Sequence, residues 1–420
     1  MALESLFVCP RTIAKYRSGP LGNLLDGYCD WLLELGFSRS TISMHLSKVS
    51  HLNSYLAAQK VLCDQVLSTE DIYDFLKKYQ LQARPRGPLG NHLRSMRMSI
   101  NRFVCYLRHL KRFRYSGQLP IFQPLLDSYL NWMRDYKHAT SGTLGIRANS
   151  LSLFLQWVGP QATAKGMSEL SVKTVEDFFL SYARKSGRAA RRSMQAALRT
   201  FFRFCLHQGL VHQPLECAVP TLRTYKLATV PRGLTDEQAL KVLNGINHNS
   251  NAGRRDYAMI RTLYTYGVRG GQVRALRLQD IDWAADQIYF KALKHGKSCL
   301  LPLIGEVGES ILDYIQNARP PSTYKEVFLT SRAPYHPLPD SNALSAIVSR
   351  HICNAGVVTH AKGAHVFRHG LATGMLQRGH SLKEIADVLG HRHLGSTFIY
   401  SKVDFNILNQ VGLPWPREVT

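Results

Sequence analysis

Apolar residues in the first half of the chain recur every three or four positions, which places them on one face of an α-helix. Residues 24–32 show this spacing, and it returns over residues 40–56. A third, short helix is expected after them, capped by Ser68 or Thr69. The first half of the chain is therefore predicted to be all-helical.

Three segments of this first half return in the same order about 100 residues downstream. The first reads Leu-Leu-Asp-Gly-Tyr-Cys-Asp-Trp, and its counterpart reads Leu-Leu-Asp-Ser-Tyr-Leu-Asn-Trp. One such match could arise by chance, but three in order indicate two tandem copies of one helical module. The matched pairs are 24–31 with 125–132, 67–75 with 170–178, and 102–107 with 202–206.

The fourth helix of each copy is basic and lacks acidic residues. The stretch from Arg84 to Arg114 contains nine Lys or Arg, and the stretch from Lys185 to Arg203 contains six. A solvated basic surface would show the same pattern. Because acids are absent at equivalent places in both copies, we expect these helices to contact DNA phosphates. The candidate DNA-binding residues are Arg188, Arg192 and Arg199 in the second copy and Arg94 and Arg97 in the first.

Composition and charge indicate the class of protein and of its partner. The 420 residues are 45% apolar and 20% charged, as in a globular protein of several domains. Lys and Arg outnumber Asp and Glu by 53 to 29, and the net charge of +24 favours a nucleic acid as partner. No apolar run is long enough to span a membrane, and no signal peptide is recognisable. The eight cysteines form no CxxC pair, so no zinc site is indicated and a cytoplasmic location is expected.

A proline-containing basic segment follows the two modules. Pro214, Pro220 and Pro231 interrupt the helical pattern, and Thr235 with Gln238 signals the start of a new helix through a capping box. We therefore predict helical modules at 1–116 and 117–218, a linker at 219–234, and a third domain at 235–420.

The third domain is predicted to be mainly helical with one small antiparallel sheet. A helix over residues 257–266 is expected to end at Gly267. A basic hairpin is expected to turn at His295 and Gly296. The predicted strands are 287–290 and 298–303, and the later helices are 344–352, 366–378 and 382–389.

Six residues of this domain suit metal-free phosphoryl transfer. Guanidinium groups can hold the oxygens of a phosphodiester and stabilise the added charge of a five-coordinate transition state. A tyrosine can attack phosphorus, a histidine can accept its proton, and a lysine can protonate the leaving oxygen. The candidates are Arg269, Lys297, His365, Arg368, His391 and Tyr400.

Each candidate also has an ordinary structural interpretation. Tyr400 is one of 19 tyrosines, and Lys297 could be a solvated hairpin residue. His365 and His369 are spaced to bind zinc together, although no glutamate completes an HExxH motif and Arg368 would repel a cation. The residue types alone therefore leave the chemistry open.

Segments of the third domain resemble the catalytic boxes of the tyrosine recombinase (phage integrase) family. Lys297 matches the family's hairpin lysine, with Lys294 as a competing match, and Gln272 stands where the family usually has an acid. Both amino-terminal modules are similar to the family's SAM-like helical core-binding domain. The matching boxes are Gly267-Val-Arg269 with Ala275-Leu-Arg-Leu278, His365-Val-Phe-Arg368-His369, and Leu389-Gly-His391 with Thr397-Phe-Ile-Tyr400.

The resemblance implies a site-specific DNA recombinase that integrates, excises or transposes a mobile element. Tyr400 would form a 3′-phosphotyrosine link and free a 5′-hydroxyl, with no metal, ATP or other cofactor. Lys297 would be the acid and His365 the base or a phosphate ligand. The transition state would be stabilised by Arg269, Arg368 and His391.

The resemblance also implies the partners. A homotetramer would bind double-stranded DNA carrying inverted repeats, and the tail Val403–Thr420 would pack on the neighbouring protomer. A recombinase that resolves chromosome or plasmid dimers, a type IB topoisomerase and a non-catalytic DNA-binding regulator are the alternatives. A metal nuclease is disfavoured because no acidic cluster lies near the six residues.

Overall fold

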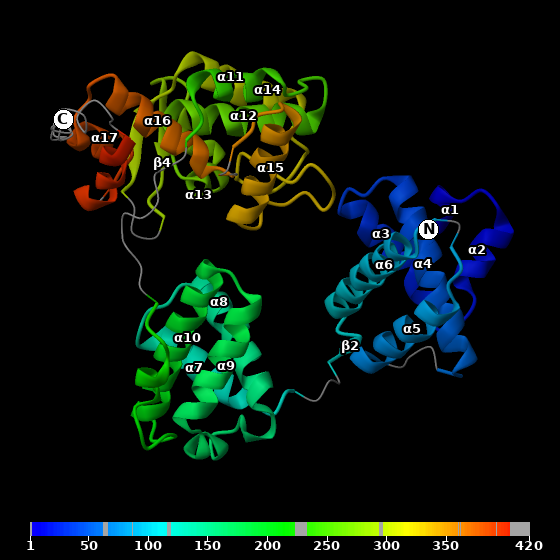
Figure 1. The fold of residues 1–420 in the computed structure, drawn as a ribbon. Helices are drawn as coiled ribbons and strands as arrows, with labels where there is room; N and C mark the ends of the chain where they lie inside the picture. Colours follow the sequence, from blue (N-terminus) through cyan, green and yellow to red (C-terminus); the bar gives the residue numbers. More distant parts are fainter. Residues whose placement is uncertain are drawn as a thin grey trace, which may run out of the picture. The chain divides into compact units, whose positions relative to one another are not determined.

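The computed structural model describes most of the chain as helices joined by short connections (Figure 1). Backbone contacts divide it into two units, one of Met1–Val66, Phe75–Phe113 and Leu227–Thr420, the other of Leu67–Asp74 and Arg114–Lys226. The described residues are 2–61, 66–85, 87–115, 119–222, 233–293, 297–359, 361, 363–391 and 393–403. Most of the predicted linker and tail therefore lie outside the described residues, as do Lys294 and the predicted hairpin turn.

The first hundred residues are helical, as the apolar spacing predicts. Helix α4 begins one residue earlier than expected, because the Ser38 hydroxyl accepts a hydrogen bond from the Thr41 N–H and caps the helix. Helices α1 and α2 and the two-stranded pairing of β1 with β2 were not predicted. The elements are α1 Ala2–Leu6, α2 Pro10–Arg17, α3 Gly22–Glu34, α4 Arg39–Ala58, β1 Leu67–Ser68, α5 Thr69–Gln82, α6 Leu89–His109 and β2 Phe113–Arg114.

The next hundred residues form a helical bundle (Figure 1). Its core contains many aromatic side chains. Phe154, Phe201 and Phe202 are fully buried in it, and each has another ring of the core within 6.4 Å between ring centres. Thr140 and Ser171 cap the second and third helices through their side chains. The elements are α7 Gln123–Asp135, α8 Ser141–Val158, η1 Gly159–Gln161, η2 Gly166–Glu169, α9 Val172–Lys185, α10 Arg188–His207 and η3 Leu215–Ala218.

The remaining described residues, 233–403, are mainly helical with a small antiparallel sheet of order β3-β4-β5, as predicted. The register pairs Ile281 with Ile288 and Phe290 with Cys299. Strand β3 and helix α14 were not predicted. The helices and 3-10 turns are α11 Asp236–Asn244, α12 Asn251–Tyr266, α13 Gly270–Arg274, η4 Leu278–Asp280, α14 Gly305–Asn317, α15 Ser341–Asn354, α16 His365–Gln377, α17 Leu382–Val388, η5 Leu394–Ser396 and η6 Phe398–Val403; the strands are β3 Ile281–Asp282, β4 Gln287–Phe290 and β5 Cys299–Pro302.

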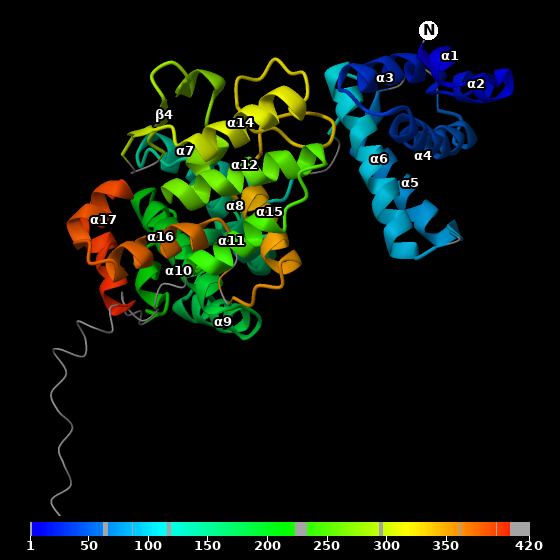
Figure 2. The ribbon, with the colours of Figure 1, turned by 90° about the horizontal axis from the view of Figure 1, so that it is seen from above.

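Helix α12 is the central element of residues 233–403. It packs against α14 and α16, and Figure 2 shows α11 and α15 beside it. Ala258, Met259, Ile260 and Leu263 are completely buried, so this helix is apolar on more than one face. It ends at Gly267, whose φ of 57° is the left-handed conformation that glycine adopts without strain. The helix end just before Arg269 is thereby set by its own sequence.

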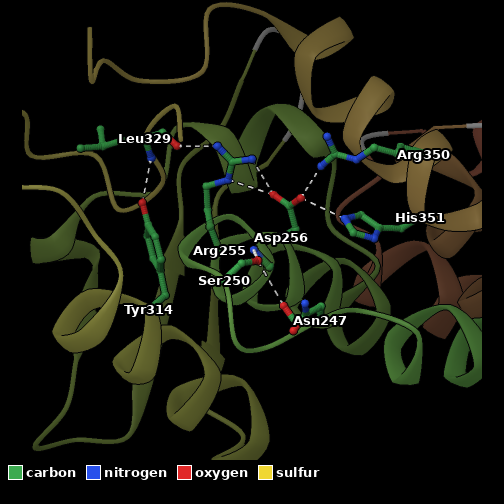
Figure 3. Close-up of polar contacts among 9 residues, drawn as sticks. Asn247, Ser250, Arg255, Asp256, Tyr314, Leu329, Arg350 and His351 are labelled. Atoms are coloured by element: carbon green, nitrogen blue, oxygen red, sulfur yellow. Dashed lines mark hydrogen bonds and ion pairs between the residues drawn. The ribbon is translucent and has the colours of Figure 1, made fainter. Parts of the chain in front are cut away.

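A buried ionic cluster joins α12 to α15 (Figure 3). The Asp256 carboxylate is 1% exposed and accepts hydrogen bonds from Arg255, Arg350 and His351 at 2.6–2.9 Å. Arg255 also donates to the Leu329 carbonyl oxygen at 3.0 Å. Burial alone would raise the pKa of Asp256, but the hydrogen bond from His351 and the charge of Arg255 outweigh it and lower that pKa.

In the parts of the chain that the structure describes, no helix combines the length and apolarity needed to cross a lipid bilayer.

Substituting Asp256 is expected to destabilise this part of the protein strongly. An Asp256→Ala protein keeps the buried Arg255 charge without its partner, and breaking such a pair costs about 3–5 kcal/mol. Chemical denaturation followed by tryptophan fluorescence measures the loss. Asp313→Ala removes the partner of Arg254 in a partly exposed ion pair and is the matched control, with a much smaller expected effect. Equal effects of the two substitutions would contradict the role given to Asp256.

Candidate active site

Arg368 on α16 connects three segments that are distant in sequence. Its side chain is 5% exposed. One terminal nitrogen donates to the Gly267 carbonyl oxygen at 2.8 Å, and the other to the Leu389 carbonyl oxygen at 2.7 Å. Those carbonyls lie at the ends of α12 and α17, two residues before Arg269 and His391. Arg368 therefore brings the three predicted boxes together.

Gln272 fixes the turn that carries Arg269. Its side-chain oxygen accepts from the Arg269 N–H at 3.1 Å, and its side-chain nitrogen donates to the Lys291 carbonyl oxygen at 3.2 Å. Gln272 is 4% exposed. A carboxylate at this position could accept the first bond but could not donate the second. Gln272, which stands where the family usually has an acid, thus links the Arg269 turn to the base of the hairpin.

Lys297 lies two residues before the returning strand β5 and is exposed. Its carbonyl oxygen borders Gly390, since a Cβ placed on that glycine would lie 3.8 Å from this oxygen and 3.1 Å from Cys299 Sγ. The backbone of Lys297 is therefore next to the turn that leads into His391.

Tyr400 is held by the segment that follows His391. The His391 Nδ1 and the Thr397 hydroxyl are 2.8 Å apart, and the Tyr400 N–H donates to the Thr397 carbonyl oxygen at 2.9 Å. Thr397 is fully buried, and Tyr400 is 2% exposed. The Tyr400 ring packs with Ala372, Ile385 and Leu389 and so rests against α16 and α17.

His369 is the residue that the sequence interpretation missed. Its Nδ1 lies 2.8 Å from the Tyr400 hydroxyl oxygen, and the two ring centres are 5.7 Å apart. The sequence placed His369 in the second matching box and suggested it as a possible zinc ligand with His365, whose ring centre is 6.3 Å away, but did not give it a catalytic role. Its position directly after Arg368, on the helix that the tyrosine packs against, was the available signal.

The two guanidinium charges act on the same group of residues. The pKa of His365 is lowered by burial and then by Arg368 and Arg269. The same causes, in the same order, lower the pKa of His391 to about 4. Burial raises the pKa of Tyr400, against the opposite effect of both arginines. At neutral pH the site therefore contains neutral imidazoles and a protonated phenol beside two positive charges.

Metal ligands form no cluster in this site. Over the described residues, no group of three or more His, Cys, Asp or Glu could hold a metal ion.

This chain matches a known family and several known proteins. The phage integrase family model matches residues 232–406. The Sinorhizobium fredii protein y4rA, which carries the name integrase/recombinase, is 38% identical over 97% of this chain and 97% of its own length. The chain belongs to the phage integrase family. It is a tyrosine recombinase, an enzyme that transfers DNA strands.

Two further comparisons place the recombinase within that family. Tyrosine recombinase XerC of Oceanobacillus iheyensis is 28% identical to it, over 66% of this chain and 91% of its own length. A lambda integrase tetramer bound to a Holliday junction shares its fold, with a TM-score of 0.51 and 16% identity over 78% of this chain and 85% of that one.

The predicted DNA-binding arginines of the recombinase lie on α6 and α10. Arg188 and Arg192 are exposed on α10, as Arg94 and Arg97 are on α6. Arg199 differs from them. Its guanidinium donates to the Val219 carbonyl oxygen at 2.9 Å and to the Thr221 hydroxyl at 2.7 Å, which ties α10 to the segment that follows it.

The depressed pKa of His391 is directly measurable in the recombinase without DNA. We expect an NMR titration midpoint near pH 4 for His391. An ordinary histidine titrates at about pH 6.5. Because the folded-state pKa is the lower one, this group favours folding above about pH 6.5 and ceases to do so as pH falls through 4. The spectrum of His391→Gln assigns the signal. A midpoint near 6.5 would contradict the buried, arginine-flanked environment.

Proposed function

We propose that the recombinase cleaves and rejoins DNA through a 3′-phosphotyrosine bond at Tyr400. The observation that carries this proposal is the position of the Tyr400 hydroxyl. It lies beside the neutral imidazole of His369, and the positive charges of Arg368 and Arg269 act on it. A phenol so placed can lose its proton as it attacks phosphorus. The covalent bond conserves the energy of the broken phosphodiester, so a 5′-hydroxyl of the partner duplex can reverse the step without ATP.

Arg269, Arg368 and His391 stabilise the five-coordinate transition state. Arginine suits this role because its forked donors match two phosphate oxygens at once. Arg368 uses one bond from each terminal nitrogen for a carbonyl, which leaves a second N–H on each nitrogen and the Nε–H for phosphate. His391, protonated when the phosphate lies beside it, donates a hydrogen bond to a phosphate oxygen. His365 serves as a phosphate ligand or as the base.

Lys297 is the proposed acid for the leaving 5′-oxygen. Its side chain is exposed at the edge of the sheet, and its backbone borders the His391 turn. An ammonium group there can reach a DNA strand that lies over the site and protonate the oxygen as the bond to phosphorus breaks.

The two amino-terminal modules are proposed to be duplicated core-binding domains that hold DNA. Supporting this, a Tyr and a Trp three residues later on α3 recur on α7, and in each module the tyrosine has an edge-to-face contact with a phenylalanine of the basic helix. The paired contacts are Tyr28–Trp31 at 6.2 Å with Tyr129–Trp132 at 6.3 Å, and Tyr28–Phe103 at 5.0 Å with Tyr129–Phe201 at 5.5 Å. The second module and the catalytic domain, predicted at 117–218 and 235–420, grip the recombination site, and the first module extends the contact.

The working assembly is a homotetramer on two DNA sites with inverted repeats. The fold match to a lambda integrase tetramer on a Holliday junction supports this proposal. The tail after Val403 lies outside the described residues, and we propose that it packs on the neighbouring protomer. The reaction takes place in the cytoplasm.

Movement of a mobile element is the proposed biological role. XerC aligns with two thirds of this chain, whereas y4rA aligns along nearly all of it. The additional length favours an integrase or transposase over a recombinase that resolves chromosome or plasmid dimers. Sequencing the junctions of the DNA that carries the gene tests this role, because a mobile element leaves defined ends and a circular intermediate.

Replacing the nucleophile is the direct test of the chemistry. On a nicked duplex the cleaved end diffuses away, so wild-type protein is trapped as a covalent DNA adduct that denaturing electrophoresis detects. Tyr400→Phe is expected to bind the duplex but form no adduct. An adduct formed by Tyr400→Phe would contradict the assignment, and relaxation of plasmids without a recombination site would favour a topoisomerase.

Reversing one exposed charge on α10 is expected to weaken DNA binding. Arg192→Glu removes a phosphate contact and should reduce the salt dependence of log K by about one unit. Lys173→Glu changes the net charge equally at an exposed site on α9 of the same module, and should have little effect. Gel-shift titration at several salt concentrations measures both. An equal loss in both variants would show that only total charge matters.

A further inference from the structure

The Tyr400 hydroxyl has a specific partner that belongs to none of the predicted catalytic positions. His369 Nδ1 lies 2.8 Å from it, a normal distance for an O–H···N hydrogen bond. Tyr400 is 2% exposed, so it is shielded from water, while His369 is partly buried. In the described part of the chain no other side chain is hydrogen-bonded to this hydroxyl.

His365 is less well placed to act on the nucleophile. It is more exposed to solvent than His369, and its ring centre lies 6.3 Å from that of His369. No hydrogen bond joins His365 to Tyr400 among the described residues. Of the two histidines on this face of α16, His369 is therefore the one in contact with the reacting oxygen.

The backbone around His369 has little freedom to move. On one side Arg368 is bound to the carbonyl oxygens of Gly267 and Leu389. On the other side Gly370 lies against the segment before α11, where an added Cβ would come within 2.4 Å of the Leu234 carbonyl oxygen. The imidazole is thus presented to Tyr400 by a helix that is held on both sides, as a precisely positioned base requires.

We propose that His369 is a further catalytic residue, the general base that holds the Tyr400 hydroxyl and accepts its proton during attack on DNA. This inference rests on the proposed function of Tyr400 and identifies which group removes its proton. It assigns His365 to phosphate binding rather than to proton transfer.

The protonation states agree with this direction of transfer. Burial, His365 and Arg368 lower the pKa of His369, so its imidazole is neutral near pH 7 and one ring nitrogen can accept. Burial raises the pKa of Tyr400, so the phenol carries its proton until attack. The hydrogen bond therefore runs from the Tyr400 hydroxyl to Nδ1, with the remaining imidazole proton on Nε2.

The proposed step balances as follows. As the bond between the Tyr400 oxygen and phosphorus forms, the phenolic proton moves to Nδ1 of His369. The bond from phosphorus to the 5′-oxygen breaks, and that oxygen takes a proton from Lys297. In the resealing step a 5′-hydroxyl attacks phosphorus and gives its proton to the Lys297 amine. The bond from phosphorus to the Tyr400 oxygen breaks, and the His369 imidazolium returns its proton to the departing phenolate.

The test measures the rate of covalent adduct formation by wild-type, His369→Asn and Lys297→Ala proteins. Each is given a nicked duplex with an ordinary phosphodiester and one with sulfur in place of the bridging 5′-oxygen. Asparagine can retain an acceptor near the Nδ1 position but cannot take a proton. The sulfur leaving group needs no acid, whereas the attacking phenol still needs a base.

His369→Asn is expected to be slower than wild type by about 10²–10⁴-fold on both substrates, the usual contribution of a general base. Lys297→Ala should be slow on oxygen and regain most of its rate on sulfur. A His369→Asn rate equal to wild type, or restored by sulfur, would overturn the inference.

Two controls separate the possible causes of a slow reaction. Wild-type protein that forms no adduct on either substrate would instead refute the proposed function of Tyr400. Gel shift and thermal unfolding show whether His369→Asn binds DNA and folds as wild type does. If it does not, His369→Gln replaces it in the same assay, and a rate equal to wild type again contradicts the role of His369.

Discussion

The site depends first on the two hydrogen bonds from the Arg368 guanidinium to the carbonyl oxygens of Gly267 and Leu389. Hydrogen bonds from a charged donor contribute about 1.5–3 kcal/mol each, more than a neutral pair. Burial and the neighbouring Arg269 lower the pKa of Arg368 to about 10, which still leaves it charged at neutral pH. One buried cation thus holds together the ends of α12 and α17, and with them Arg269 and the segment from His391 to Tyr400.

The surrounding scaffold keeps this arrangement rigid. The Asp256 cluster in Figure 3 joins α12 to α15. Leu344 of α15 also lies close to Gly270, since a Cβ added to this glycine would be 3.1 Å from the Leu344 side chain. Gln272 adds a neutral link from the Arg269 turn to the hairpin. Among the described residues no ion pair joins Arg269 or Arg368 to a carboxylate, whereas Arg255 and Arg350 are paired with Asp256. A phosphodiester would therefore meet positive charge that is not already paired with a carboxylate.

Much of the helical structure follows from local sequence. The apolar period of α3, the capping box of Thr235 with Gln238, and the glycine stop at Gly267 each involve residues within four positions of one another. Helix α14 and strand β3 were missed. Strand β3 is only two residues long, which is too short for an alternating pattern to be recognised.

The site was predictable in its members but not in all their contacts. The matching segments identified Arg269, Arg368, His391 and Tyr400. In the structure the charge of Arg269 affects the pKa values of the other three, so the four groups lie close together. The bond from His369 to Tyr400 spans 31 residues and depends on how η6 packs against α16, which no local pattern encodes. The hydrogen bonds from Arg199 to Val219 and Thr221 were likewise not predictable, because the spacing of basic residues on α10 does not indicate them.

A crystal structure of the recombinase with cleaved DNA and orthovanadate tests the central claim most directly. Vanadate adopts the five-coordinate geometry of a phosphoryl transition state. The predicted result is vanadium bonded to the Tyr400 oxygen and to a 5′-oxygen of DNA, with Arg269, Arg368 and His391 in hydrogen-bond contact with its equatorial oxygens. Vanadate bound elsewhere, or bonded to a different side chain, would contradict the account.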